Sequence, residues 1–413
     1  CIDIALKDSP AVKAAEEEVI ASEARKKEAF TNFLPTFSTS YTAAKLNKDP
    51  WVYFPGFEPM LPVPASEMTV GTRDNFTWAF EVKQPIFTGG AIYSGYKARS
   101  LGVDVANRDD QTRRLDVVLQ VKTAYFSILK AEHTREVAAQ AVEMLKSHRK
   151  SVQDFYNEEM IPRNDLLHVE VELANSTKSL LRVENGVEIA KANLNTVLHR
   201  PLNIPVEVED IPLAKPFEKP LEHCLLVAGE NRPEIVAAEL KAHQAGYMVD
   251  IARSEYFPTI AAVGHFDRFG DDPSLKGSIY KDKENWYVAG VASWNFFEWG
   301  RTKNKVQASR ATSNEALHAL ELTKDQVRLE AKTAFLDLQD AKRQVDVSKK
   351  AVEHAEENYR ITVEHFHEQL GTNTDVLDAQ TLLTSARTDL VNAVNDYNLS
   401  QARLERAMGL IVS

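Results

Sequence analysis

The chain repeats itself, and this duplication restricts its possible folds more than any single motif does. The matching segments are Lys122-Thr-Ala-Tyr125 with Lys332-Thr-Ala-Phe335, Asp165-Leu-Leu167 with Asp375-Val-Leu377, and Gly90 with Gly300. Each pair is 210 positions apart (300 − 90). A repeat of this length indicates that one structural unit is used twice, usually around a pseudo-symmetry axis.

Upstream of these segments the offset changes. Pro35-Thr36 matches Pro258-Thr259 at an offset of 223 (258 − 35), so one connection in the first copy is 13 residues longer (223 − 210). We therefore predict a first repeat over 1–199, a linker over 200–221 and a second repeat over 222–413. Each repeat is expected to run helix, strand, loop, strand, long helix, turn, helix.

Four segments alternate as two-faced strands. They are expected at about 36–46, 75–87, 259–269 and 286–296. About ten residues is also the length of a tilted strand that crosses a bilayer. Trp286, Trp294 and Phe296 at strand ends suit an interfacial aromatic girdle. Taken alone, the strands fit the edge of a soluble β-sandwich equally well.

Long helices distinguish these alternatives. The segments predicted to form them cover about 91–198 and 301–408, each a helix, a turn and a returning helix. No proline interrupts 91–157, and Val118, Val121, Tyr125 and Ile128 follow a 3-4-3 spacing. This spacing is typical of a coiled-coil seam. Helical hairpins roughly 100 Å long need lateral partners for their apolar stripes.

Four strands are too few to close a barrel, because the smallest membrane barrels need about eight. An open sheet in lipid would leave unpaired backbone groups at its edges. If these strands enter a membrane, the chain must therefore oligomerise.

Composition excludes several other classes. A net charge of −11 argues against a nucleic-acid partner. No Ser/His/Asp or Cys/His set in the sequence suggests an enzyme. The histidines His365 and His367 point apart on a helix, so no metal site is predicted, and no other cofactor is predicted either. Cys1 is a candidate lipid attachment site or, like its counterpart Cys224, a small hydrophobe on a short amphipathic helix.

The ordered set of motifs resembles the TolC family of outer-membrane efflux and secretion channels. The segments that carry the resemblance are Gln84-Pro-Ile-Phe-Thr-Gly-Gly90, Phe33-Leu-Pro-Thr36 with Tyr256-Phe-Pro-Thr259, and Gly371-Thr-Asn-Thr-Asp-Val-Leu-Asp-Ala-Gln380. The resemblance covers essentially the whole chain. It implies a mainly α-helical protomer with four β-strands. Three such protomers would build a 12-stranded barrel in the outer membrane and a helical tunnel in the periplasm.

By the same resemblance, the homotrimer would be a passive exit duct of a tripartite efflux pump or a type I secretion system. It would contact outer-membrane lipid, a periplasmic adaptor protein and an inner-membrane transporter. The alternative is a soluble coiled-coil scaffold with a small β-domain.

The second helical turn carries the candidate pore gate. Asp375 and Asp378 lie at i and i+3, so they share a helix face, and threefold symmetry would arrange each as a ring of carboxylates. The equivalent residues in the first repeat are Asp165 and His168, and nearby Arg163 is a candidate salt-bridge partner that holds the gate shut. Alternatively, Asp375 is only a helix N-terminal charge favoured by the dipole.

The turns at the helix tips are the candidate docking surface for the adaptor, as the resemblance implies. The residues assigned to it are Met160, Ile161 and Pro162 in the first turn and Leu370, Gly371 and Thr372 in the second. The alternative is ordinary turn packing.

Overall fold

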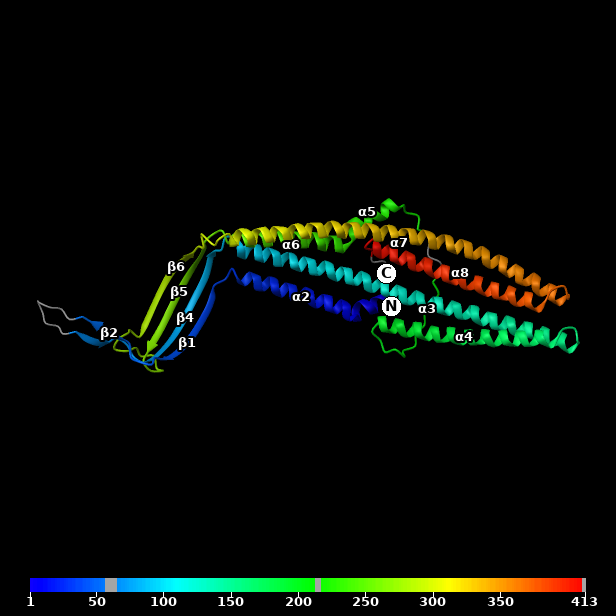
Figure 1. The fold of residues 1–413 in the computed structure, drawn as a ribbon, viewed down its shortest axis with the longest axis horizontal. Coiled ribbons are helices and arrows are strands. Elements are labelled where there is room, and N and C mark those ends of the chain that lie inside the picture. The colour runs from blue at the N-terminus through cyan, green and yellow to red at the C-terminus, as the bar shows by residue number, and fades with distance from the viewer. Residues whose placement is uncertain (56–64, 212–216, 411–413) are drawn as a thin grey trace. The chain divides into compact units, whose positions relative to one another are not determined.

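A computed structural model describes residues 1–55, 65–211 and 217–410. The helices are α1 Ile2–Asp8, α2 Pro10–Thr31, α3 Ala91–Asn157, α4 Arg163–Val197, α5 Leu221–Asn231, α6 Pro233–Ser254, α7 Arg301–His367 and α8 Asn373–Ala407. The strands are β1 Thr36–Lys45, β2 Trp51–Phe54, β3 Ser66–Thr69, β4 Asp74–Phe87, β5 Thr259–Gly270 and β6 Glu284–Ser293 (Figure 1). This is the predicted fold class, mainly α with a smaller β part.

Apart from β2 and β3, the two halves of the chain match element by element. Helices α3 and α7 both contain 67 residues, and α4 and α8 both contain 35. Helices α2 and α6 both contain 22 residues and both begin at a proline, which a first helical position tolerates because its N–H has no intrahelical partner.

Two strand features differ from the sequence prediction. Strand β6 ends at Ser293 rather than 296, because its last partner is Thr259 and the preceding Pro258 has no N–H to extend the ladder. The connection between β1 and β4, expected to be a loop, contains a two-stranded ribbon of β2 and β3.

Contacts group the chain into two units, each containing parts of both halves. One holds the sheet together with residues 21–35, 88–103, 240–258 and 294–317. The other holds 1–20, 104–239 and 318–413, except the undescribed positions.

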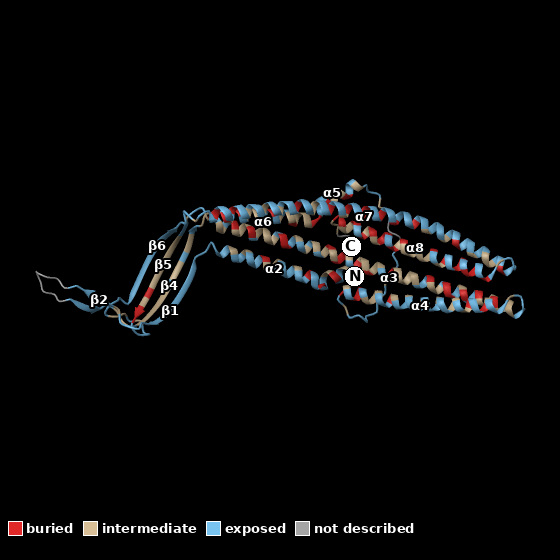
Figure 2. Ribbon diagram, viewed as in Figure 1, coloured by how far each residue is buried: buried red, intermediate tan, exposed pale blue. Residues whose placement is uncertain are grey.

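The main sheet is open. Its strand order is β1-β4-β5-β6, and every neighbouring pair is antiparallel. Among the described residues β1 and β6 each pair with one strand only, so both edges present unpaired backbone groups. Figure 2 shows that most of this sheet is exposed or half-buried.

The register separates two chemically different faces. Residues that are directly opposite in an antiparallel pair share a face. Pairing of Tyr41 with Trp78, of Phe80 with Phe266, and of Phe266 with Trp286 therefore carries one apolar face across all four strands. The other face is polar. It holds Glu81, His265 and Asp267, and Asn285 donates a hydrogen bond to the Asp267 carboxylate at 3.1 Å.

In the helical unit four long helices lie in the order α4, α3, α8, α7, with α4 and α7 at opposite edges (Figure 1). Polar contacts tie neighbours together: Arg149 to Glu170 at 2.8 Å, Gln380 to the Ala141 carbonyl at 3.2 Å, and Arg387 to Glu356 at 2.7 Å. On α7 the buried residues recur at alternating spacings of four and three, which is a coiled-coil seam. They are Val327, Ala331, Ala334, Leu338, Ala341 and Val345.

A buried charged cluster links α3, α6, α7 and α8 near the end of α8. Arg232 pairs with Glu234 at 2.8 Å and Glu330 at 2.9 Å, and Arg406 pairs with Glu234 and Asp116, both at 2.7 Å. Burial alone would raise the pKa of Glu234, but the Arg232 hydrogen bond and both guanidinium charges hold it below its usual value. The pairs are therefore ionised and hold these helices together.

The two faces of β6 give a matched test of which face meets lipid. Val288 lies on the apolar face and is 77% exposed, whereas Val291 lies on the polar face and is 48% exposed. We expect Val288→Arg to destabilise the membrane-inserted protein by about 2–4 kcal/mol, because a charge on the lipid face must be desolvated. Val291→Arg should have a small effect. Urea unfolding in liposomes measures both, and equal losses would contradict the assignment of faces.

Candidate functional site

The two helix-tip turns, residues 158–162 and 368–372, have the same backbone. Glu159 and Gln369 adopt left-handed φ values of 60° and 61°. The amide of Met160 donates to the Phe155 carbonyl at 2.9 Å, and that of Leu370 donates to the His365 carbonyl at 2.8 Å. Left-handed residues of this kind terminate helices and satisfy their last carbonyls. Each long helix therefore stops and reverses at its tip.

The returning helices begin differently. At α8 the Asp375 amide donates to the Thr372 hydroxyl at 3.2 Å, and the Thr372 amide donates to the Asp375 carboxylate at 2.8 Å. These bonds form a capping box. Hydrogen bonds from the hydroxyl and the amide of Thr372 lower the pKa of Asp375. At α4 the capping position is Pro162, which has neither a hydroxyl nor an N–H, so Asp165 lacks this restraint.

The predicted gate residues lie at these helix starts. Asp375 and Asp378 are both exposed on the first turns of α8, while the intervening Val376 and Leu377 are buried. This places both carboxylates on one accessible side. His168 and Arg163 are exposed, and Asp165 is half-buried.

The structure does not bring Arg163 to a carboxylate. Within the described part of one protomer Arg163 makes no ion pair. The assignment of Asp375, Asp378, Asp165, Arg163 and His168 to a pore gate therefore stays a prediction about an assembly of several copies.

The predicted docking residues form a small apolar tip. Met160 is 49% exposed and Leu370 is 73% exposed, while Ile161 packs partly onto the buried cluster beneath. Pro162 and Thr372 are exposed, and Gly371 is half-buried. Gln369 lies 3.7 Å from the Met160 sulfur, so the two tips of one protomer touch. Docking of an adaptor here stays a prediction.

Sequence reasoning missed the polar contact that joins the two tips. The Nε2 atom of His148 lies 2.8 Å from the Asn373 side-chain oxygen, and the Asn373 amide donates to the Asp165 carbonyl at 3.2 Å. His148 is 6% exposed and Asn373 is 3% exposed. The Phe366 ring packs against His148 with a centroid separation of 5.0 Å. The sequence signal that could have indicated this contact is a histidine at a seam position of α3, where a buried residue is expected.

Burial lowers the pKa of His148, and the nearby His367 lowers it further, while the Asn373 hydrogen bond acts in the opposite direction. The imidazole is therefore neutral at neutral pH. Charging it would place an unpaired cation between the two tips. The contact can act as a pH-sensitive restraint.

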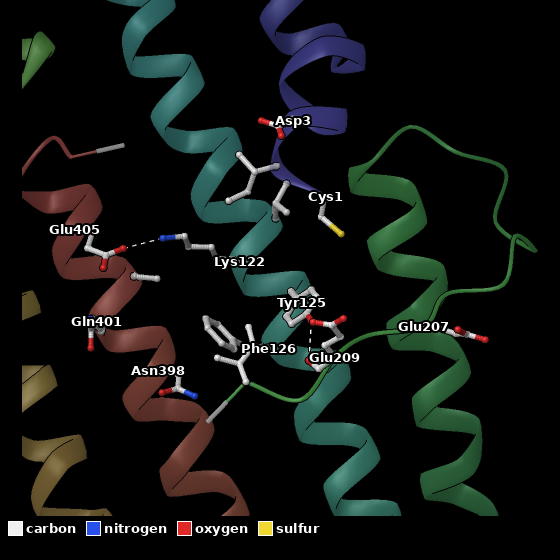
Figure 3. Close-up of a pocket in the computed structure, with 14 residues that line it drawn as sticks. Cys1, Asp3, Lys122, Tyr125, Phe126, Glu207, Glu209, Asn398, Gln401 and Glu405 are labelled. Atoms are coloured by element: carbon white, nitrogen blue, oxygen red, sulfur yellow. Dashed lines mark hydrogen bonds and ion pairs between the residues drawn. The ribbon is translucent and has the colours of Figure 1, made fainter. Parts of the chain in front are cut away.

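A hollow of about 690 Å³ lies between α3, α8 and the first part of the linker (Figure 3). Lys122 pairs with Glu405 across it at 2.8 Å, and the Tyr125 hydroxyl donates to the Glu209 carbonyl at 2.7 Å. Burial raises the pKa of Tyr125. The described lining combines carboxylates with aromatic rings and contains no histidine, so it offers no histidine base for an adjacent nucleophile.

Metal sites, membrane-spanning helices and cysteines are the remaining features that bear on function. In the described residues no group of three or more His, Cys, Asp or Glu side chains is placed to hold a metal ion. No helix in the described part of the chain has the length and apolarity needed to cross a bilayer. Cys1 is exposed and Cys224 is buried, and both are free thiols.

Residues 1–199 and 227–410 match the family described as Outer membrane efflux protein. Outer membrane protein TolC of Escherichia coli is 22% identical over 357 residues, covering 83% of this chain and 71% of TolC. Outer membrane efflux protein BepC of Brucella suis is 18% identical over 337 residues, covering 82% of this chain and 73% of BepC.

Solved structures share the fold. VceC, an outer membrane protein of Vibrio cholerae, superposes with a TM-score of 0.84 at 17% identity, covering 99% of this chain and 95% of VceC. The CmeC outer membrane channel of Campylobacter jejuni gives 0.82 at 19% identity, covering 99% of this chain and 84% of CmeC.

Three observations lead to one conclusion: the helical hairpins are duplicated, the sheet is open with one apolar face, and the family match covers nearly the whole chain. This protein belongs to the outer membrane efflux protein family, and it is an outer-membrane channel whose helical part lies in the periplasm.

Proposed function

We propose that three copies of this chain close one 12-stranded barrel and one helical tunnel, which together form the passive exit duct of a tripartite efflux pump. The open sheet edges carry this proposal. In lipid the unpaired groups of β1 and β6 must find partners, and β1 of one copy can pair with β6 of the next. The continuous apolar face argues against a soluble scaffold, which would leave it in water.

The edges of the helical layer support the same assembly. Helix α7 exposes leucines seven residues apart on the side opposite its seam with α8: Leu322, Leu329 and Leu336. Helix α4, at the other edge, exposes Leu167, Val171, Leu181 and Ile189. Two unpartnered apolar stripes at opposite edges are complementary surfaces for side-by-side copies.

An adaptor protein and an inner-membrane transporter are the partners that this assembly would need. The exposed tip residues Met160 and Leu370 are suitable apolar anchors for an adaptor hairpin. Energy for transport would come from the transporter. The family is one of channels, and we propose that this chain has no catalytic activity.

Replacing one edge leucine tests the assembly. We expect Leu329→Asp to remove roughly 2 kcal/mol of apolar burial at each contact between copies and to dissociate the trimer. Leu382→Asp, which changes a similarly exposed leucine on α8, is the matched control. Size-exclusion chromatography with light scattering in detergent measures the mass, and a stable Leu329→Asp trimer would contradict this interface.

We further propose that Asp378 and Asp375 form two stacked carboxylate rings at the tunnel end. The double variant Asp375→Asn/Asp378→Asn should weaken block by multivalent cations in planar-bilayer conductance, because the rings would lose their negative field. The single variant Asp378→Asn leaves the Thr372–Asp375 capping box intact and should lose part of the block.

Asp337→Asn/Asp346→Asn removes the same charge from exposed positions on α7 and is the control. If cation block is unchanged in the double variant, the carboxylates are not at the constriction.

Acidification should open the duct through His148. Its folded-state pKa is lowered, so the closed tip binds fewer protons than an open tip with a solvated imidazole. The closed state is therefore fully stable above about pH 6.5 and loses stability as pH falls toward the lowered value. We expect resting conductance to rise between pH 7 and pH 5.

His148→Gln can keep the hydrogen bond to Asn373 but cannot titrate, so this rise should shrink in that variant. His354→Gln, at an exposed position on α7, should respond to pH as the unmodified protein does. If the pH response of the conductance is unchanged in His148→Gln, groups other than His148 cause that response.

A further inference from the structure

Two adjoining hollows lie between α6 and α7 in the unit that contains the sheet. Their volumes are about 590 and 450 Å³, and Arg253 and Arg310 line both. We name the second one the basic groove; it is lined by Arg253, Tyr256, Phe257, Lys303, Gln307 and Arg310, together with Val306.

The groove carries uncompensated positive charge. Nearby carboxylates are already engaged: Asp250 holds Arg253 at 3.3 Å, Glu298 holds Arg301 at 2.7 Å, and Glu255 pairs with Lys305. Within the described part of the chain neither Lys303 nor Arg310 makes an ion pair. Two cations therefore face a hollow large enough for a ligand.

The first repeat carries different residues at the positions that correspond to the groove. Arg253 corresponds to Phe30, Tyr256 to Phe33 and Val306 to Tyr96 by the repeat offsets. There the three rings pack on one another, with centroid separations of 5.9 to 6.1 Å, beside a hollow of about 410 Å³. Lys303 and Arg310 correspond to Tyr93 and Ser100. The second repeat thus has cations at three positions where the first repeat has Phe30, Tyr93 and Ser100.

The groove lies next to the end of the apolar sheet face. The Trp294 indole follows β6 and donates to the Tyr256 carbonyl at 3.1 Å. Tyr256, Phe257, Trp294, Phe296, Phe297 and Trp299 are all exposed here. Exposed aromatics at the end of an apolar membrane face occupy the headgroup level. Since helical side chains tilt toward the N-terminus, Lys303 and Arg310 on α7 lean toward that level, and Arg253 on α6 leans toward them.

We propose that the basic groove binds the phosphate of an anionic phospholipid headgroup in the periplasmic leaflet of the outer membrane, one per protomer. Guanidinium groups bind phosphate oxygens in pairs, and Lys303 adds a point charge. The aromatic rim of Tyr256 and Phe257 contacts the glycerol and the upper acyl chains. This proposal rests on the membrane placement of the sheet given under the proposed function.

The test uses the full chain purified in detergent, with phosphatidylglycerol added and bound lipid counted by native mass spectrometry. Lys303→Gln/Arg310→Gln should weaken phosphatidylglycerol binding by about fivefold per cation, because each basic residue near a membrane surface contributes ~1 kcal/mol. Lys342→Gln/Lys349→Gln removes the same charge from exposed positions elsewhere on α7 and should leave binding unchanged.

A second variant, Lys303→Tyr/Arg310→Ser, installs the residues of the first repeat and should abolish the preference for phosphatidylglycerol over phosphatidylcholine. Equal lipid retention in the groove and control variants would overturn the proposal. So would binding of glycerol 1-phosphate as tight as that of the lipid, because it would identify a small-anion site. The same spectra report oligomeric mass, so loss of lipid from an intact assembly is distinguishable from failure of the assembly itself.

Discussion

Backbone hydrogen bonding in lipid is the constraint on which this structure depends. A bilayer offers no partners for peptide N–H and C=O groups, and the four-stranded sheet leaves β1 and β6 paired on one side only. A single chain therefore cannot be the functional unit in a membrane. Duplication supplies two strand pairs to one sheet, and further copies must supply the rest of the wall. The division of the sheet into a mainly apolar face and a mainly polar face follows from the same requirement, because one side meets lipid and the other lines the pore.

The helical unit contains a buried network of ion pairs at one end of α8 and a hydrogen bond to a titratable histidine at the other. The ionised cluster around Glu234 and Arg406 joins several helices at one end of α8, and breaking one partner of such a buried network costs about 3–5 kcal/mol. At the other end of α8, the tips are joined by the His148–Asn373 hydrogen bond, at a buried site that disfavours the protonated imidazole. A duct built this way can keep its wall intact while its tips separate.

Much of the fold could be predicted from sequence because local signals fixed it. Proline at positions 10 and 233 marks helix starts, and the absence of proline over 91–157 predicts the uninterrupted α3. Contacts between distant segments could not be predicted in this way. Nothing local to His148 identifies Asn373, 225 positions away, as its partner. The early end of β6 depends on Pro258 in a different strand segment. Arg163 makes no ion pair within the described part of one protomer, so its salt bridge stays a prediction about an assembly of several copies.

The 13-residue difference between the repeats has a consequence for the cell surface. The extra length lies between β1 and β4, at the sheet end remote from the helices, and it contains the β2–β3 ribbon. Because the helices are periplasmic, this ribbon faces the surroundings of the cell, and it exposes Trp51, Tyr53 and Phe54 there. Among the described residues this ribbon shares no hydrogen-bonded ladder with the main sheet. Sequence changes in this ribbon are therefore expected to leave the pairing of the four main strands, and with it the channel wall, intact.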